Sequence, residues 1–143
     1  MKIRDIMTDD VAVVSPDSTV LEVAQLMQKH DVGAVPVCEG ANIVGLVTDR
    51  DIVVRNIAHG KDPHQTPVKD VMTTQVKSAN PEMSLSQAAG IMAAQQIRRL
   101  PVVDENRLVG MVSLGDLATK AKYDVELGTT LGEISLPSEP EKI

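Results

Sequence analysis

The sequence predicts an α/β fold made of two tandem copies of one βαββα unit. Three observations support this prediction: the second half of the chain repeats the first, each copy alternates helix-like with strand-like hydrophobic spacing, and the apolar residues are almost all aliphatic. Hydrophobic residues make up 43% of the chain, yet it contains no Phe or Trp and a single Tyr. The core is therefore expected to consist of aliphatic side chains, with Met filling the gaps.

The internal repeat begins at the N-terminus. The segment IRDIMT, residues 3–8, returns as VKDVMT, residues 68–73, which sets an offset of 65 residues that continues without a gap. Each copy of about 55 residues is small for an independent domain, because a short chain buries too little of its surface. We therefore expect the two copies to pack around a pseudo-two-fold axis, with their sheets in contact and related clefts between the halves.

The first copy contains a predicted strand, helix, hairpin and second helix. Thr19 and Glu22 have the spacing of a capping box, and the apolar spacing after them predicts a helix over residues 20–30. The runs AVPVC and NIVGLVT are short and rich in β-branched residues, as in a hairpin. A second helix follows over residues 49–60 and ends on a Gly suited to a C-cap.

The second copy repeats these signals in the same order. Ser84 and Gln87 form the equivalent capping box, RLPVVD and RLVGMVS the hairpin, and GDLATKAK the last helix. The expected organisation is a first repeat over residues 1–60, a linker over residues 61–67, a second repeat over residues 68–123, and a tail over residues 124–143. This tail is acidic and contains Pro, so we expect partial disorder there, with one short turn around residues 131–134.

Composition excludes several classes of function. The formal net charge is −6, with 14 basic and 20 acidic residues, which disfavours a nucleic-acid partner, and a single Tyr is the one aromatic residue available for base stacking. No signal peptide and no apolar segment of about 18 residues is evident, so we expect a cytoplasmic protein with no membrane partner. Cys38 lies in an apolar run, which predicts a buried, inert thiol. Neither an activated nucleophile nor a Gly-rich phosphate loop emerges, so the protein is not expected to be an enzyme.

The order of these motifs resembles a pair of cystathionine-β-synthase (CBS) domains, the Bateman module. The resemblance covers Lys2 to about Lys122, and we expect a small stand-alone protein without an attached catalytic domain. It implies a disk-like pair of units with two clefts, which in this family often bind AMP, ADP, ATP or S-adenosylmethionine. It also implies a homodimer that regulates an unknown partner protein, with no required cofactor.

The family pattern is Gly, two residues, Thr or Ser, two residues, Asp. It is complete in both copies, as Gly45, Thr48 and Asp51 and as Gly110, Ser113 and Asp116. A carboxylate can accept hydrogen bonds from ribose hydroxyls, and a hydroxyl at a helix N-terminus can bind ribose or phosphate. The same residues can equally serve as ordinary helix caps. The residues alone leave both interpretations open.

Cationic residues differ between the copies. Arg50 precedes Asp51, whereas its counterpart is a glycine, and only the second copy has the pair Arg98 and Arg99. Successive strand residues point to opposite faces, so at most one of these two arginines is expected to face a given cleft. The resemblance favours Arg99 as a phosphate contact, and a solvated surface role is the alternative. We predict unequal affinities, the stronger cleft being the one with Thr48, Arg50 and Asp51.

The adenine base would have to be held by aliphatic side chains. The resemblance implies Val32 and Ile97 as base contacts, with Thr8 and Thr73 nearby; plain core packing is the alternative for Val32 and Ile97. It further implies that the base pocket of one half meets the Thr or Ser and the Asp of the other.

Two hypotheses compete for the function. The first is a sensor of adenosine-containing nucleotides, and the second is a ligand-free dimer that acts as an interaction scaffold, with both Asp residues as helix caps. A metal site formed by His59, Asp62 and His64 is disfavoured, since the connector offers no Cys ligand and poor spacing.

Overall fold

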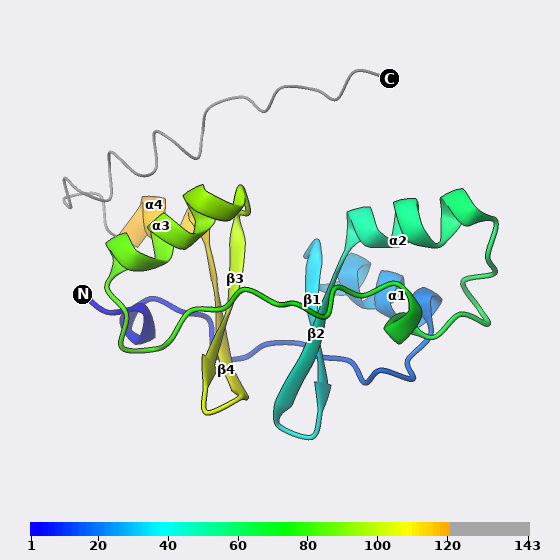
Figure 1. The fold of residues 1–143 in the computed structure, drawn as a ribbon, viewed down its shortest axis with the longest axis horizontal. Helices are drawn as coiled ribbons and strands as arrows, with labels where there is room; N and C mark the ends of the chain where they lie inside the picture. Colours follow the sequence, from blue (N-terminus) through cyan, green and yellow to red (C-terminus); the bar gives the residue numbers. More distant parts are fainter. Residues whose placement is uncertain (121–143) are drawn as a thin grey trace, which may run out of the picture.

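The computed structural model describes residues 1–120 and contains two similar halves, each a β-hairpin flanked by two helices (Figure 1). The first half contains α1 (Val20–His30), β1 (Ala34–Glu39), β2 (Asn42–Thr48) and α2 (Asp49–Arg55), followed by the 3-10 helix η2 (Ile57–His59). The second half contains α3 (Leu85–Gln95), β3 (Arg99–Asp104), β4 (Arg107–Ser113) and α4 (Leu114–Lys120). The predicted α/β class and both hairpins are confirmed, and a helix lies at each of the four predicted places. The second predicted helix, over residues 49–60, is shorter than expected, because α2 ends at Arg55 and η2 follows as a separate 3-10 helix.

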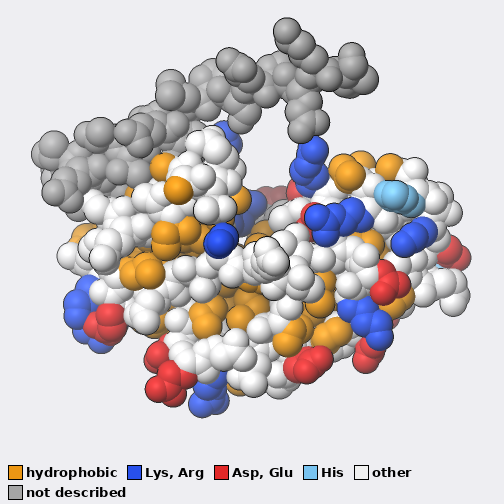
Figure 2. All heavy atoms as spheres, in the orientation of Figure 1, with side chains coloured by type: hydrophobic (Ala, Val, Ile, Leu, Met, Phe, Trp, Pro, Cys, Tyr) orange, Lys and Arg blue, Asp and Glu red, His pale blue; other side chains and the backbone are white. Residues whose placement is uncertain are grey.

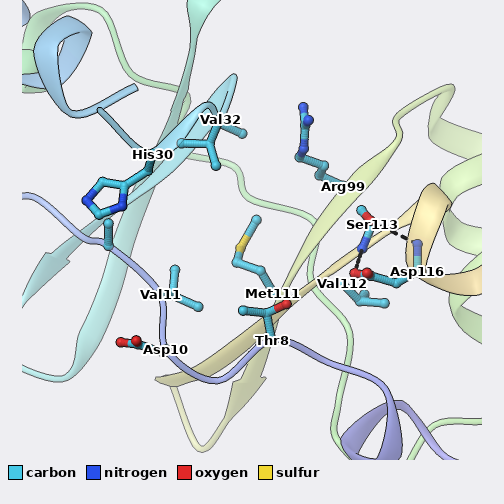
Figure 3. Close-up of a pocket in the computed structure, with 12 residues that line it drawn as sticks. Thr8, Asp10, Val11, His30, Val32, Arg99, Met111, Val112, Ser113 and Asp116 are labelled. Atoms are coloured by element: carbon cyan, nitrogen blue, oxygen red, sulfur yellow. Dashed lines mark hydrogen bonds between the residues drawn. The ribbon is translucent and has the colours of Figure 1, made fainter. Parts of the chain in front are cut away.

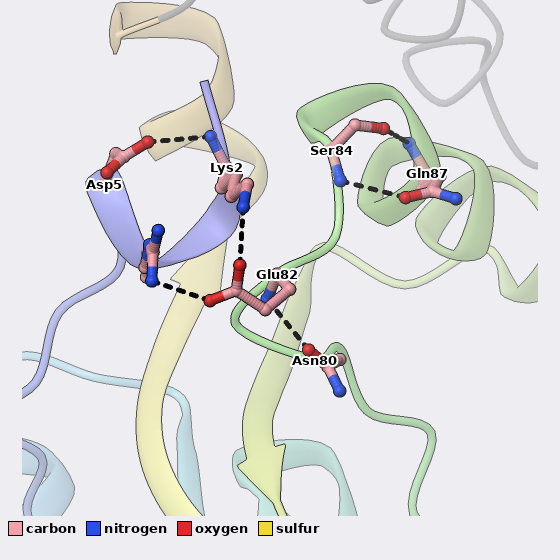
Figure 4. A network of polar contacts seen from close by, with 7 residues as sticks. Lys2, Asp5, Asn80, Glu82, Ser84 and Gln87 are labelled. Carbon is pink, nitrogen blue, oxygen red and sulfur yellow. Dashed lines mark hydrogen bonds and ion pairs between the residues drawn. The ribbon is translucent and has the colours of Figure 1, made fainter.

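Local capping explains where the first helix of each half begins. The hydroxyl of Ser84 accepts a hydrogen bond from Gln87 N–H at 3.1 Å, and Gln87 Oε1 accepts one from Ser84 N–H at 2.9 Å (Figure 4). The hydroxyl of Thr19 likewise accepts from Glu22 N–H at 3.2 Å, without the reciprocal bond. The predicted capping box is therefore complete at α3 and half formed at α1.

The predicted first strand of each unit is wrong. The structure has 3-10 helices there, η1 (Ile3–Asp5) and η3 (Val68–Asp70), followed by isolated bridges instead of a continuous ladder. Thr8 exchanges two backbone hydrogen bonds of 2.8 Å with Met111, and Thr73 does the same with Leu46 at 2.8 and 2.9 Å. The bridges made by Thr8 and Thr73 each join one repeat to the other.

The two entry segments, residues 2–8 and 67–73, are exchanged between the halves. Ile3 and Ile6 belong to the core of the second half, whereas Val68 and Val71 belong to the core of the first. The N-terminus accordingly lies beside α3 and α4 (Figure 1). Lys2 and Arg4 hold it there through ion pairs of 2.6 and 2.8 Å with Glu82 (Figure 4). Each folded half thus combines one repeat with the entry segment of the other.

The hairpins meet edge to edge in one sheet of order β1-β2-β4-β3. A single residue pair, Asn42 with Arg107, joins β2 to β4. The expectation that two sheets pack on each other is therefore wrong. Each hairpin already buries its apolar side against its own helices and an exchanged segment, which gives two separate core clusters.

The connector between the repeats is held by hydrogen bonds to α1. The N–H groups of Val20 and Leu21 donate to the carbonyls of Thr66 and Pro63 at 2.9 and 3.1 Å. These bonds satisfy amides that the first turn of a helix leaves without intrahelical partners. The expectation for the tail over residues 124–143 lies outside the described residues.

Candidate functional site

Two clefts lie between the halves, and their linings correspond at the repeat offset. The cleft that contains Asp51, called the Asp51 cleft below, has a volume of about 510 Å³. The cleft that contains Asp116, called the Asp116 cleft, has a volume of about 360 Å³. Both volumes are in the range of small-molecule sites, which is about 300–1,000 Å³.

Each cleft takes residues from both halves, in the crossed arrangement that the resemblance implies. The Asp51 cleft joins Thr48 and Asp51 of the first hairpin unit to Thr73 and Ile97. The Asp116 cleft joins Ser113 and Asp116 to Thr8 and Val32 (Figure 3). The structure therefore brings eight of the ten predicted site residues into two matching sets of four; their roles in ligand binding stay predictions.

The Thr–Asp and Ser–Asp pairs form helix caps. Thr48 Oγ1 accepts a hydrogen bond from Asp51 N–H at 3.1 Å, and Asp51 Oδ2 accepts one from Thr48 N–H at 3.0 Å. Ser113 and Asp116 repeat this arrangement at 3.0 and 2.9 Å (Figure 3). Within residues 1–120, Oδ1 of each carboxylate accepts no hydrogen bond. The cap uses one oxygen of each Asp and leaves the other available to a ligand in the cleft.

Glycine is required where an exchanged segment crosses each hairpin. A Cβ on Gly110 would lie 2.9 Å from the carbonyl oxygen of Thr8, and one on Gly45 would lie 3.1 Å from that of Thr73. Both carbonyls accept hydrogen bonds from the hairpins, so neither can move away freely. The Gly of the sequence pattern thus allows the threonine to reach its cleft.

The charges of the two clefts differ strongly. Lys77, Arg98 and Arg99 line the Asp51 cleft, where Asp51 is the one acidic residue. The Asp116 cleft has two carboxylates, Asp10 and Asp116, with His30 and the same Arg99. Figure 2 shows Lys and Arg side chains near the junction of the two halves. The Asp51 cleft is therefore the one whose charge suits an anionic ligand.

Two expectations about arginine need correction. Arg50 is exposed on the first turn of α2 and lines neither cleft, because adjacent helical residues are separated by about 100° around the axis. Arg98 and Arg99 both line the Asp51 cleft. Since β3 begins at Arg99, Arg98 lies in a bend where strand alternation does not apply.

The positions of Val32 and Ile97 are compatible with both interpretations that the sequence left open, core packing and contact with a base. Each is partly buried and packs against the core cluster of its half, and each also lines a cleft. Residues that we did not predict include Asp10 and Lys77, which follow Thr8 and Thr73 just beyond the exchanged segments. Comparison of the copies could have found them, because Lys77 is aligned with Ala12 and Asp10 with Gln75.

Within residues 1–120, neither the cysteine nor the His, Asp and Glu side chains form a second candidate site. Cys38 is buried, and burial raises the pKa of its thiol. Residues 1–120 contain no group of three or more His, Cys, Asp or Glu placed to hold a metal ion. None of the helices in this part of the chain is long and apolar enough to cross a bilayer.

Known proteins with similar sequences and structures match both repeats. The family model of the CBS domain matches residues 3–56 and 68–123. The CBS domain-containing protein YhcV of Bacillus subtilis (strain 168) is 51% identical over 133 residues, which are 93% of this chain and 94% of that protein. The crystal structure of Hypoxic Response Protein I with two coordinated zinc ions is 35% identical, with a TM-score of 0.79, over 84% of this chain and 98% of that one. The CBS domain pair of protein MJ0100, in complex with 5′-methylthioadenosine and S-adenosyl-L-methionine, is 25% identical with a TM-score of 0.73, over 82% of this chain and 93% of that one.

Proposed function

The chain belongs to the CBS-domain family as a tandem pair, which is a regulatory module, and from this premise we propose that it senses an adenosine-containing nucleotide in the Asp51 cleft. The observation that carries the proposal is the composition of that cleft. It combines a hydrogen-bond acceptor for ribose, an aliphatic wall for a base and three cations for phosphates. A similar module, the CBS pair of MJ0100, is described in complex with two adenosine ligands.

The ribose would be bound by Asp51. Its side chain is 14% exposed, and Oδ1 forms an ion pair of 3.9 Å with Arg55 Nε but accepts no hydrogen bond within residues 1–120. A carboxylate oxygen in this position can accept hydrogen bonds from the vicinal hydroxyls of a ribose. Arg55 also donates hydrogen bonds to the carbonyls of Val71 and Met72 at 3.2 and 3.3 Å. The arginine beside the Asp51 carboxylate is therefore anchored to the exchanged segment over residues 67–73.

The phosphates would be bound by Lys77, Arg98 and Arg99. All three side chains are exposed in this chain, so they can rearrange around a polyanion. Guanidinium groups bind phosphate oxygens in pairs, and a lysine adds a point charge. The base would lie against Ile97 and Leu46, which line the same cleft. The predicted difference in affinity then favours this cleft, with Arg98 and Lys77 taking the role that we expected of Arg50.

The experiment that tests this function is a thermal-shift titration with AMP, ATP and S-adenosylmethionine. A ligand at 100 times its dissociation constant stabilises the fold by about 2.7 kcal/mol. Asp51→Asn keeps one oxygen for the cap and replaces the free acceptor by a donor, so ATP binding should weaken roughly ten- to a hundred-fold, as for the loss of a hydrogen bond to a charged group. Asp116→Asn is the matched control and should leave ATP binding within about three-fold. No stabilisation by any of the three ligands would refute the proposal.

The second candidate function is a ligand-free interaction scaffold, and the helix caps favour it because each cap is complete without a ligand. Three exposed apolar side chains also lie on or next to α2, namely Val53, Val54 and Ile57, which are 59%, 44% and 54% exposed. Such side chains suit the expected homodimer. A scaffold would show a dimer mass in sedimentation equilibrium and no thermal shift with any nucleotide.

A further inference from the structure

One arginine lies where the two clefts meet. Arg99 lines both of them, and so does Ala34, its counterpart in the first repeat. Figure 3 shows Arg99 extending between Val32 of the first half and Ser113 of the second. Because alanine carries no charge, the two clefts share a single guanidinium at this position.

The side chain of Arg99 is free to approach either cleft. It is exposed, and within residues 1–120 it forms no ion pair and no hydrogen bond. Gly33 lies beside the Arg99 side chain. A Cβ on Gly33 would lie 3.5 Å from Arg99 Nη1 and 3.0 Å from Asp49 Oδ2. Gly33 thus leaves open the space in which the guanidinium lies. No contact in the described chain fixes Arg99 to one side.

The clefts depend on Arg99 to different extents. Without it, the Asp51 cleft keeps Lys77 and Arg98, which still outnumber its carboxylate. The Asp116 cleft would keep two carboxylates, Asp10 and Asp116, with His30 as its one other basic side chain. With His30 neutral, the position of Arg99 therefore decides whether one of the two carboxylate charges in the Asp116 cleft is offset or neither is.

We propose that Arg99 couples the two clefts and sets the ligand class of the second one. A phosphate-bearing ligand in the Asp51 cleft draws the guanidinium to its anionic groups, which leaves the Asp116 cleft more acidic because neither of its carboxylates is then offset. That cleft then accepts a neutral or cationic nucleoside and excludes a second polyphosphate. This inference rests on the proposed function, since it requires a nucleotide in the Asp51 cleft.

The coupling must be reciprocal. If ATP raises the affinity of the Asp116 cleft for a cationic nucleoside, that nucleoside raises the affinity for ATP by the same factor. Coupling between sites commonly changes affinity by about 5- to 150-fold. A shared exposed charge belongs at the lower end of this range, because solvent screens it, so we expect a change of about five- to ten-fold.

The experiment is calorimetric titration of the full chain with three probes: ATP, neutral adenosine and cationic S-adenosylmethionine. S-adenosylmethionine is titrated with and without saturating ATP, and its loss of binding in Asp116→Asn assigns it to the Asp116 cleft. We expect saturating ATP to raise the affinity of the chain for S-adenosylmethionine about five- to ten-fold and to change its affinity for adenosine less. ATP itself should bind with a stoichiometry of one per chain.

Two arginine variants separate a shared side chain from general charge. Arg99→Ala should abolish the coupling. Arg98→Ala is the matched control, because Arg98 lines the Asp51 cleft alone; it should weaken ATP binding and preserve the coupling. Neither arginine side chain makes a hydrogen bond or an ion pair within residues 1–120, so both alanine variants should fold, which circular dichroism checks. Arg99→Lys should retain part of the coupling.

The outcomes distinguish this inference from the function on which it rests. Equal affinity for S-adenosylmethionine with and without ATP, or equal loss of coupling in both alanine variants, would overturn the role of Arg99 and leave nucleotide binding in place. Two equivalent ATP sites would also overturn it. An absence of ATP binding to the unmodified chain would overturn both proposals.

Discussion

At Gly110, strand β4 leaves room for the backbone of the exchanged N-terminal segment, and alanine would fill that room. The new Cβ would lie 2.8 Å from Met7 Sδ and 2.9 Å from the carbonyl oxygen of Thr8. The methionine can change rotamer, but the carbonyl accepts a hydrogen bond of 2.8 Å from Met111 N–H. Alanine at this position must therefore displace the segment that carries Thr8 into the Asp116 cleft.

The cost of this substitution follows from two opposing effects. Overpacking a tight site typically costs about 1–3 kcal/mol. Replacement of Gly by Ala also lowers the conformational entropy of the unfolded chain, which stabilises the folded state by about 0.4–1 kcal/mol. We therefore expect Gly110→Ala to lower the free energy of unfolding by about 1–2 kcal/mol, measured by urea denaturation.

Gly90 provides the matched control for this prediction. It lies within α3, and a Cβ added there would meet no atom of residues 1–120 within 4 Å beyond the backbone of its own helix. Gly90→Ala should stabilise the chain by about 0.5–1 kcal/mol, because alanine is the better helix former. The two substitutions are chemically identical and should have opposite signs. A Gly110→Ala chain as stable as the unmodified one would refute the role assigned to the exchanged segment.

Three further predictions concern the caps, the thiol and the N-terminal ion pair. Asp51→Ala should be about 1 kcal/mol less stable to urea than Asp51→Asn, since only Asn keeps an acceptor for the cap; equal stability would contradict the capping geometry. Cys38 should react slowly with a thiol reagent at pH 8 in the folded chain and rapidly in urea, because burial raises its pKa and blocks access; fast labelling of the native chain would contradict this. Glu82 has a lowered pKa because Lys2 donates a hydrogen bond to it and Arg4 lies close. Its contribution is present above the pKa of an unfolded Glu and is lost as the pH falls through the folded value, so the stability difference between the unmodified chain and Glu82→Gln should vanish in acid. A difference that grows toward low pH would contradict the stabilising role of the Glu82 carboxylate.

Most of the local structure could be predicted from the sequence because its causes are local. The cap at Ser84 and Gln87 acts within four residues, and the two hairpins follow from short β-branched runs. The exchange of entry segments could not be predicted. Ile3 and Val68 present the same apolar pattern to either half, so only the packed structure decides which core each joins.

In the candidate site, too, the features with local causes could be predicted from the sequence and those that depend on packing could not. Thr48, Asp51, Ser113 and Asp116 form a pattern with fixed spacing, and the structure brings each pair to a cleft. The cations were harder to place, because an arginine on the surface is not constrained by periodicity. Arg98 was misplaced because β3 begins one residue later, and Arg50 because its neighbour on the helix faces another direction.

Binding of an adenosine-containing nucleotide in the Asp51 cleft is tested most directly by a crystal structure of the chain grown with ATP. Binding in this cleft predicts electron density for ribose beside Asp51, for the base beside Ile97, and for phosphates among Lys77, Arg98 and Arg99. Density for the triphosphate in the Asp116 cleft, or at a surface away from both clefts, would contradict it.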